Sequence, residues 1–144
     1  KKGIFYTLSF IFGWDNDTEE SFQNTLDFIN RNKVPMAFFR VLTPRKGTGL
    51  YEIFDKENRI LYKDGDEREY LINKCIYQPK NFSPEQLDER IWKMYRQMYS
   101  FKSMFKRRVF PPKLKSGTGI VLGSNLFFYF GVRLNKQLNP QDYY

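Results

Sequence analysis

Two short apolar segments on either side of an amphipathic stretch constrain this 144-residue chain most strongly. Residues 4–12 (IFYTLSFIF) and 36–42 (MAFFRVL) are rich in the β-branched and aromatic side chains that favour strands. Between them, Phe22, Leu26 and Ile29 recur at the spacing of one helix face. Strand, helix and strand make a βαβ unit, whose strands are parallel and whose crossover is right-handed. We therefore expect an α/β fold.

The turn after the first expected strand has two possible roles. Residues 4–12 do not alternate cleanly between apolar and polar, so we expect that strand to be buried on both faces. Gly13 then permits a tight bend, and Asp17 or Thr18 caps the helix, with Glu20 at a capping-box spacing from Asp17. This describes an ordinary strand-to-helix turn. The alternative is a ligand site, because ligands bind at the carboxyl ends of parallel strands.

The second half of the chain is basic and helical. The chain carries a net charge of +8, and all of that excess lies in residues 80–144. Ser83 begins a helix with a capping box to Gln86, and an apolar stripe from Leu87 to Phe105 predicts one helix of about five turns. A last helix is expected over residues 119–136. We expect three parts: residues 1–62, a connecting extended segment 63–79, and a basic helical domain 80–144.

The composition excludes several kinds of site. The chain has no histidine and one cysteine, Cys75. It cannot form an internal disulfide, a cysteine-ligated metal site of its own, or a site with histidine acid–base chemistry. We therefore expect no catalytic and no metal-binding residue, and a core position for Cys75. A single cysteine fits a reducing, cytoplasmic setting. Residues 119–132 are apolar but shorter than the about 20 residues that span a bilayer, which predicts a buried helix and no membrane span.

A basic cluster with interleaved phenylalanines allows two interpretations. One is a phosphate-binding surface for nucleic acid, and the other is the solvated face of a helix followed by a basic loop. We favour the solvated face, because the phenylalanines fit the buried stripe of the helix, and we do not expect a nucleic-acid partner. A stand-alone basic binding module for nucleic acid or another anionic partner stays as the alternative function. The cluster consists of Lys102, Lys106, Arg107, Arg108, Lys113 and Lys115.

Three consecutive motifs carry a resemblance to a known family. GWDNDT, ESFQNTLDFI and LTPRKGTGLYE, within residues 3–62, resemble the fifth-strand to sixth-strand region of radical SAM iron–sulfur enzymes. The resemblance is strongest to the cobalamin-binding-domain subfamily, which includes magnesium-protoporphyrin IX monomethyl ester oxidative cyclase. IYQPKNFSPEQLDERIWKMYRQMYSFKSMFKR is similar to the helical domain that follows the barrel in some of those proteins.

This resemblance implies the end of a partial (β/α) barrel followed by a mainly helical C-terminal region. The parent enzyme would be an oxidoreductase with an iron–sulfur cluster and S-adenosylmethionine. Cobalamin would belong to a separate N-terminal domain, and the sequence leaves open whether the parent uses it. The cluster-binding motif C-x3-C-x2-C is absent here, so the resemblance implies a non-catalytic C-terminal part that works with a missing N-terminal part of the same chain. It also implies that Ile11 and Gly13, with Leu42 and Thr43, line the adenine pocket. An open sheet edge would further favour self-association or repacking of the C-terminal helices.

Overall fold

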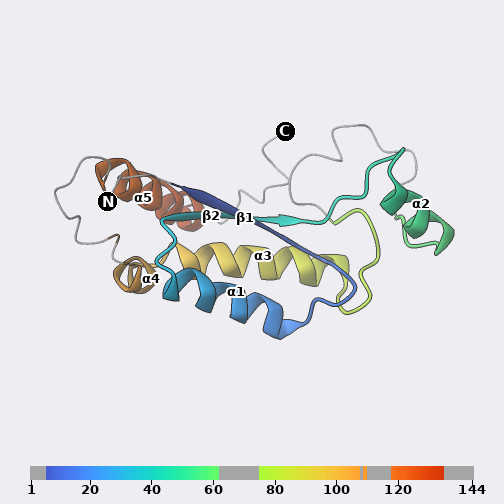
Figure 1. Ribbon diagram of the computed structural model, residues 1–144, viewed down its shortest axis with the longest axis horizontal. Helices are drawn as coiled ribbons and strands as arrows, with labels where there is room; N and C mark the ends of the chain where they lie inside the picture. Colours follow the sequence, from blue (N-terminus) through green and yellow to red (C-terminus); the bar gives the residue numbers. More distant parts are fainter. Residues whose placement is uncertain (1–5, 62–74, 108, 110–117, 135–144) are drawn as a thin grey trace.

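The computed structural model describes residues 6–61, 75–107, 109 and 118–134. Figure 1 shows the two strands side by side, with α1 and α3 running beneath them and α5 at the left, near the start of β2. The chain has an α/β fold: a small parallel sheet and several helices. Its described elements are β1 (Thr7–Phe12), α1 (Glu19–Arg31), β2 (Met36–Val41), α2 (Gly49–Lys56), α3 (Pro84–Met98), α4 (Phe101–Lys106) and α5 (Thr118–Leu134).

The two strands form the parallel pair that the sequence predicts. β1 and β2 pair in register from Thr7 opposite Met36 to Phe12 opposite Val41. One further backbone bond, from the Leu42 amide to the Phe12 carbonyl at 2.8 Å, extends the ladder past the end of β2. The intervening helix α1 completes the expected βαβ unit.

The residues that form the capping hydrogen bonds at the start of α1 differ from those that the sequence predicts. Thr18 is the N-cap, and its amide donates to the Ser21 hydroxyl at 3.1 Å. Ser21 therefore takes the capping-box role expected of Glu20. The Asp17 carboxylate instead accepts from the amides of Gly13 and Trp14, at 2.8 and 3.0 Å, and so holds the turn that leaves β1.

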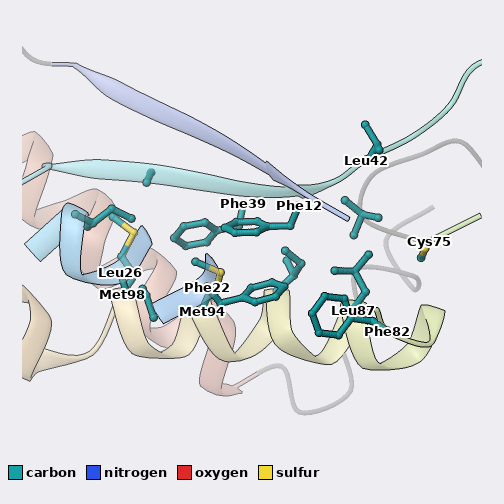
Figure 2. Packing of buried hydrophobic residues seen from close by; sticks show 14 of the residues in the cluster. Phe12, Phe22, Leu26, Phe39, Leu42, Cys75, Phe82, Leu87, Met94 and Met98 are labelled. Carbon is teal, nitrogen blue, oxygen red and sulfur yellow. The ribbon is translucent and has the colours of Figure 1, made fainter. Parts of the chain in front are cut away.

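One hydrophobic core joins the sheet to α1 and α3 (Figure 2). The Phe12 and Phe22 rings stack at 4.6 Å between β1 and α1. Phe39 of β2 lies against the Tyr95 ring of α3 at 5.0 Å, with the rings nearly perpendicular. This packing covers only one side of β1. Its alternate residues Thr7, Ser9 and Ile11 are exposed, so the expectation of a strand buried on both faces is wrong.

Two tyrosine hydroxyls, from Tyr95 in α3 and from Tyr99 just after α3, occupy the edge of β2 that faces away from β1. The Tyr95 hydroxyl accepts from the Phe39 amide at 3.0 Å and donates to the Phe39 carbonyl at 3.1 Å. Tyr99 donates to the Ala37 carbonyl at 2.9 Å. These hydroxyls bond to backbone groups that a neighbouring strand would otherwise bind, so β2 is a closed edge of the sheet.

The expected five-turn helix is two helices. α3 ends at Met98, and Ser100 caps α4 by accepting from the Ser103 amide at 3.2 Å. The apolar spacing continues through the break, which is why periodicity did not reveal it. A serine that caps the next helix offers the backbone an alternative to the continuous helical ladder.

The last helix is not the buried helix that its composition predicts. Within α5, Asn125 and Val132 are buried, whereas Ile120, Phe127 and Leu134 are 71%, 73% and 78% exposed. No helix among the described residues is long and apolar enough to cross a membrane.

The remaining predictions are tested only in part. Ile60 forms an antiparallel bridge with Tyr77, which lies in the expected extended segment 63–79. Residues 63–74 of that segment lie outside the described residues. The division into 1–62, 63–79 and 80–144 stays a prediction.

Candidate functional site

The carboxyl ends of β1 and β2 meet at one rim of the sheet. Phe12 ends β1, and the Leu42 amide binds its carbonyl. The residues that follow each strand are therefore neighbours, as expected for the candidate site. Whether these residues can bind a ligand depends on which of their polar groups already form hydrogen bonds or ion pairs within the protein.

The conformation of Gly13 is explained by its contacts within the protein. Its backbone has φ of +107°, a conformation that favours glycine, and its carbonyl accepts a hydrogen bond from the buried Tyr77 hydroxyl. A Cβ atom at residue 13 would lie 2.2 Å from that hydroxyl and 2.9 Å from Leu87. The close approach of Tyr77 is thus a sufficient reason for glycine at this position.

The acidic turn after Gly13 is tied down by a buried arginine. Arg59 donates to both carboxylate oxygens of Asp15, at 2.6 and 3.1 Å, and to the Gln78 carbonyl at 2.8 Å. Its guanidinium lies 4.2 Å from the centre of the Phe54 ring. Hydrogen bonding to Arg59 lowers the pKa of Asp15, and the same bond raises the pKa of Arg59. Lys80 also pairs with Asp15, at 2.8 Å.

The carbonyls of the same turn are bound as well. The Asn81 amide group donates to the carbonyls of Asp15 and Asp17, at 2.9 and 2.8 Å. Asp15 and Asp17 therefore organise the turn. Sequence reasoning missed Arg59, Tyr77 and Asn81, because their partners lie 44 to 66 residues away and no local pattern marks them.

The four predicted adenine-pocket residues lie near this rim with different exposures. Gly13 and Leu42 are buried, and Thr43 is partly exposed, with its hydroxyl donating to the Val41 carbonyl at 3.2 Å. Ile11 is 49% exposed on the uncovered face of β1. Their assignment to a cofactor stays a prediction, with Ile11 and Thr43 the ones whose side chains a ligand could reach.

A cation beside Ile11 was missed by the sequence analysis. Arg40 of β2 pairs in register with Ile11, so the two side chains project from the same face of the sheet. Arg40 is exposed, and no ion pair joins it to a carboxylate in the part of the chain that the structure describes. Trp14, just past Gly13, is 49% exposed. The rim therefore offers apolar surface, an aromatic ring and one guanidinium.

Two other hollows lie between α1 and the helices α3 and α4. The larger has a volume of about 400 Å³ and the smaller about 110 Å³. Both are open grooves between helices. The lining of the larger one includes Asp27, Asn30, Arg96, Lys102 and Lys106.

No metal centre is found in the described residues, which are 6–61, 75–107, 109 and 118–134. No cluster of three cysteine, aspartate or glutamate residues there could hold a metal ion. Cys75 is 2% exposed, as expected of a core residue, and burial raises the pKa of its thiol to about 12.

One member of the expected basic cluster, Arg107, is buried and so is not part of a cationic surface. Arg107 is 2% exposed and binds carbonyl groups inside the protein, including that of Met98 at 2.8 Å. Lys102 and Lys106 line the larger groove, while Arg108, Lys113 and Lys115 lie outside the described residues. The interior carbonyls near Arg107 gave no local sequence signal.

Comparison with curated proteins finds methyltransferases. The chain is 37% identical over 98 residues to bacteriochlorophyllide d C-12(1)-methyltransferase of Chlorobaculum tepidum, covering 68% of this chain and 21% of that protein. It is 23% identical over 113 residues to bacteriochlorophyllide d C-8(2)-methyltransferase of the same organism, covering 78% and 25%. An uncharacterized methyltransferase of Pyrococcus horikoshii is 29% identical over 99 residues, covering 69% and 21%. No protein-family model and no solved structure matches.

These relatives are named for methyl transfer. The chain spans about a fifth to a quarter of their length. The names contradict the expected identity as part of a radical SAM oxidative-cyclase-type oxidoreductase, and they give no support to an iron–sulfur cluster in a parent enzyme or to nucleic-acid binding. The motifs in residues 3–62 led to the wrong reaction class, because a strand-end turn and a helix pattern do not specify what the whole protein catalyses.

Proposed function

We propose that the chain is part of an S-adenosylmethionine-dependent methyltransferase and contributes one wall of its binding site. The observation that carries this is the match to bacteriochlorophyllide d C-12(1)-methyltransferase over 68% of the chain. Methyl transfer needs a donor, and S-adenosylmethionine is the donor we propose. The full reaction would involve polypeptide beyond the 98 matched residues, which make up 21% of that relative.

The proposed binding wall is the rim at the carboxyl ends of β1 and β2, continued over the exposed part of the sheet face around Ile11 and Arg40. Ile11 is half-exposed there, with Arg40 beside it in register. Apolar surface can pack against a flat ring, and a guanidinium can pair with a carboxylate. S-adenosylmethionine has both an adenine ring and a carboxylate, so this pair of side chains suits it chemically.

The proposed acceptor is a large planar macrocycle of the chlorophyllide kind. This substrate class rests on the two bacteriochlorophyllide methyltransferases among the relatives. Trp14, which is 49% exposed, provides aromatic surface near the strand ends against which such a ring could pack. The described residues provide positioning in this proposal, since their turn carboxylates are engaged with Arg59, Lys80 and backbone amides.

Methyl transfer from labelled S-adenosylmethionine tests the proposal in the full-length protein that carries this sequence. Wild type should transfer label to a chlorophyllide acceptor. Ile11→Asp should raise the KM for S-adenosylmethionine about tenfold or more, because it places a carboxylate against the proposed adenine surface. Thr7→Asp is the matched control, because Thr7 is exposed on the same face of β1 at the opposite end of the strand.

Two results would count against this proposal. Absence of label transfer by a folded wild-type protein to chlorophyllide acceptors would contradict the substrate class. Equal kinetic effects of the substitutions at Ile11 and Thr7 would contradict the placement of the donor at the carboxyl end of β1.

A further inference from the structure

The exposed side of α5 carries apolar residues at a regular spacing. Residues 120, 123, 127, 130 and 134 follow one another at intervals of three, four, three and four, which is the heptad spacing of a helix that packs along another helix. Ile120, Phe127, Phe130 and Leu134 are 71%, 73%, 51% and 78% exposed. We call Ile120, Gly123, Phe127, Phe130 and Leu134 the α5 stripe.

The opposite side of α5 already has its partners. Phe128 stacks on Tyr99 at 4.7 Å and contacts Phe38 of β2 at 5.8 Å. The fully buried Asn125 side chain donates to the Pro35 carbonyl at 3.1 Å and accepts from Arg107 at 2.9 Å. These contacts fix the rotation of α5 about its axis, so the α5 stripe faces outward as a consequence of how the helix is anchored.

The exposed apolar area of the α5 stripe is larger than that of one isolated exposed side chain. Its four large side chains expose roughly 500 Å² together, at the upper end of the about 300–600 Å² found for the largest apolar patch on monomeric proteins. Two such stripes in contact would bury on the order of 1,000 Å², the lower limit for a specific protein interface.

We propose that the α5 stripe is a homodimer interface in which two copies of α5 pack antiparallel about a twofold axis at Phe127. Ile120 and Leu134 lie seven residues on either side of Phe127, so a twofold axis there places Ile120 of one copy beside Leu134 of the other. The same operation brings Phe130 of one copy level with Ser124 of the other, next to the space beside Gly123. No atom outside the helix backbone lies within 4 Å of a Cβ built at Gly123, so that position is open to receive a ring.

The sizes of the side chains along the α5 stripe favour antiparallel pairing over parallel pairing. In a parallel pair, Gly123 would face Gly123 and leave a gap, while Phe130 would crowd Phe130. Antiparallel pairing sets small against large at both places, as close packing requires.

The charges on α5 favour a protein partner over a lipid surface. Arg133 is the charged residue of the helix, and its guanidinium lies 3.9 Å from the centre of the Tyr129 ring and donates to the Arg96 carbonyl. An interfacial membrane helix carries several lysines or arginines on its polar face, which this helix lacks. Within residues 118–134, Arg133 of one copy opposes no charged residue of the other in the proposed dimer.

Sedimentation equilibrium of the 144-residue chain measures the association directly. Wild type should form dimers, and Phe127→Glu should weaken the dimer at least tenfold, because it buries a carboxylate at the axis. Ile53→Glu is the matched control on α2, since Ile53 is also an exposed apolar residue, at 53%. It should leave the dissociation constant unchanged.

Gly123→Leu distinguishes the proposed packing from non-specific association through apolar surface. It adds apolar surface but fills the space assigned to Phe130 of the second copy, so the dimer should weaken. Gly119→Leu is its control, because a Cβ at Gly119 also meets no atom within 4 Å and the residue lies at the end of α5. If Gly123→Leu strengthens association, the proposed packing is overturned.

Disulfide trapping determines the orientation of the two helices. In a Cys75→Ser background, Phe127→Cys should cross-link to itself under mild oxidation, because the axis passes through this residue. Ile120→Cys alone should not, since antiparallel copies of residue 120 lie about 20 Å apart along the helix. Cross-linking of Ile120→Cys to itself would indicate parallel pairing. That result, a monomer at every concentration, or binding to phosphatidylcholine vesicles in place of dimerisation would each overturn the proposal.

Discussion

The Tyr77 hydroxyl donates to the carbonyl of Gly13 from the space that a side chain at residue 13 would fill. This contact joins the end of β1 to a segment 64 residues later in the chain. It fixes the path of the turn after β1, and the Tyr77 side chain fills the space beside Gly13 at the rim.

We predict that Gly13→Ala lowers the free energy of unfolding by about 2–4 kcal/mol, from backbone strain at positive φ and from overlap with Tyr77 and Leu87. Gly47→Ala is the matched control, because Gly47 has φ of +84° but an open surrounding, and it should cost only about 1 kcal/mol. Urea unfolding measures both. In a Tyr77→Phe background the cost of Gly13→Ala should shrink, and an unchanged cost would contradict the account.

A second prediction concerns Arg107, whose guanidinium has each of its five N–H groups engaged by a neutral acceptor. Its partners are the Ser103 hydroxyl, the carbonyls of Val34, Pro35 and Met98, and the Asn125 side chain, at 2.8–3.2 Å. Burial lowers the pKa of Arg107 to about 10.

We predict that Arg107→Met costs about 3–5 kcal/mol of stability, because it leaves several buried carbonyls without donors. Thermal or urea unfolding checks this, with Lys102→Met as the control for loss of a cation at an exposed position. Arg107→Lys should recover only part of the loss, because an ammonium cannot reproduce the planar fork. Similar unfolding free energies for Arg107→Met and wild type would show that the buried contacts are not needed.

The sequence was most informative where neighbours along the chain determine the structure. The strands, the helix between them and the Ser83 cap follow from apolar period and capping chemistry, and all three were predicted. The Ser100 break was missed because the apolar stripe runs through it. Arg107 and Asn125 were missed because their partners are backbone carbonyls distant in sequence, and such acceptors leave no trace in residue type.

The candidate site shows the same division. Its location follows from the rule that parallel strands end at one edge, so Gly13 and Leu42 could be placed there from sequence. The engagement of Asp15 by Arg59 and the exposure of Ile11 beside Arg40 depend on tertiary pairing. No local pattern contains that information.

Cys75 supports a prediction about pH. Burial raises the pKa of this thiol to about 12 from the ordinary 9.0, so the unfolded chain loses the proton first as pH rises. The stabilisation is complete below pH 9 and is lost as pH rises toward 12, and linkage gives a fall of about 1 kcal/mol between pH 8.5 and 10. Urea unfolding of Cys75→Ser should show a smaller fall over this interval, while tyrosine ionisation affects both proteins alike. Parallel pH curves would exclude Cys75 as the source.

Tyr95 gives a prediction for the closed edge of the sheet. Tyr95→Phe removes the hydroxyl that serves both the amide and the carbonyl of Phe39, so it should cost about 1–3 kcal/mol. The Phe39 amide should then exchange with deuterium at least tenfold faster. The Leu42 amide, bound to Phe12 on the other side of β2, provides an internal control and should change only with global stability. Equal acceleration at both amides would mean that the hydroxyl does not specifically protect the edge.

Arg40 carries the prediction that bears most directly on function. Arg40 is the register partner of Ile11, so its side chain projects from the same face of the sheet, and no ion pair to a carboxylate is seen in the described portion of the chain. If it pairs with a ligand carboxylate, Arg40→Met should raise one KM about tenfold and leave kcat nearly unchanged, because a binding contact away from the reacting atoms acts equally on ground and transition states. We expect the affected KM to be that of S-adenosylmethionine. Lys46→Met, at an exposed position in the loop after β2, is the control. A rise in the acceptor KM instead would place the substrate carboxylate at Arg40, and no change in either KM would remove this face of the sheet from the binding site.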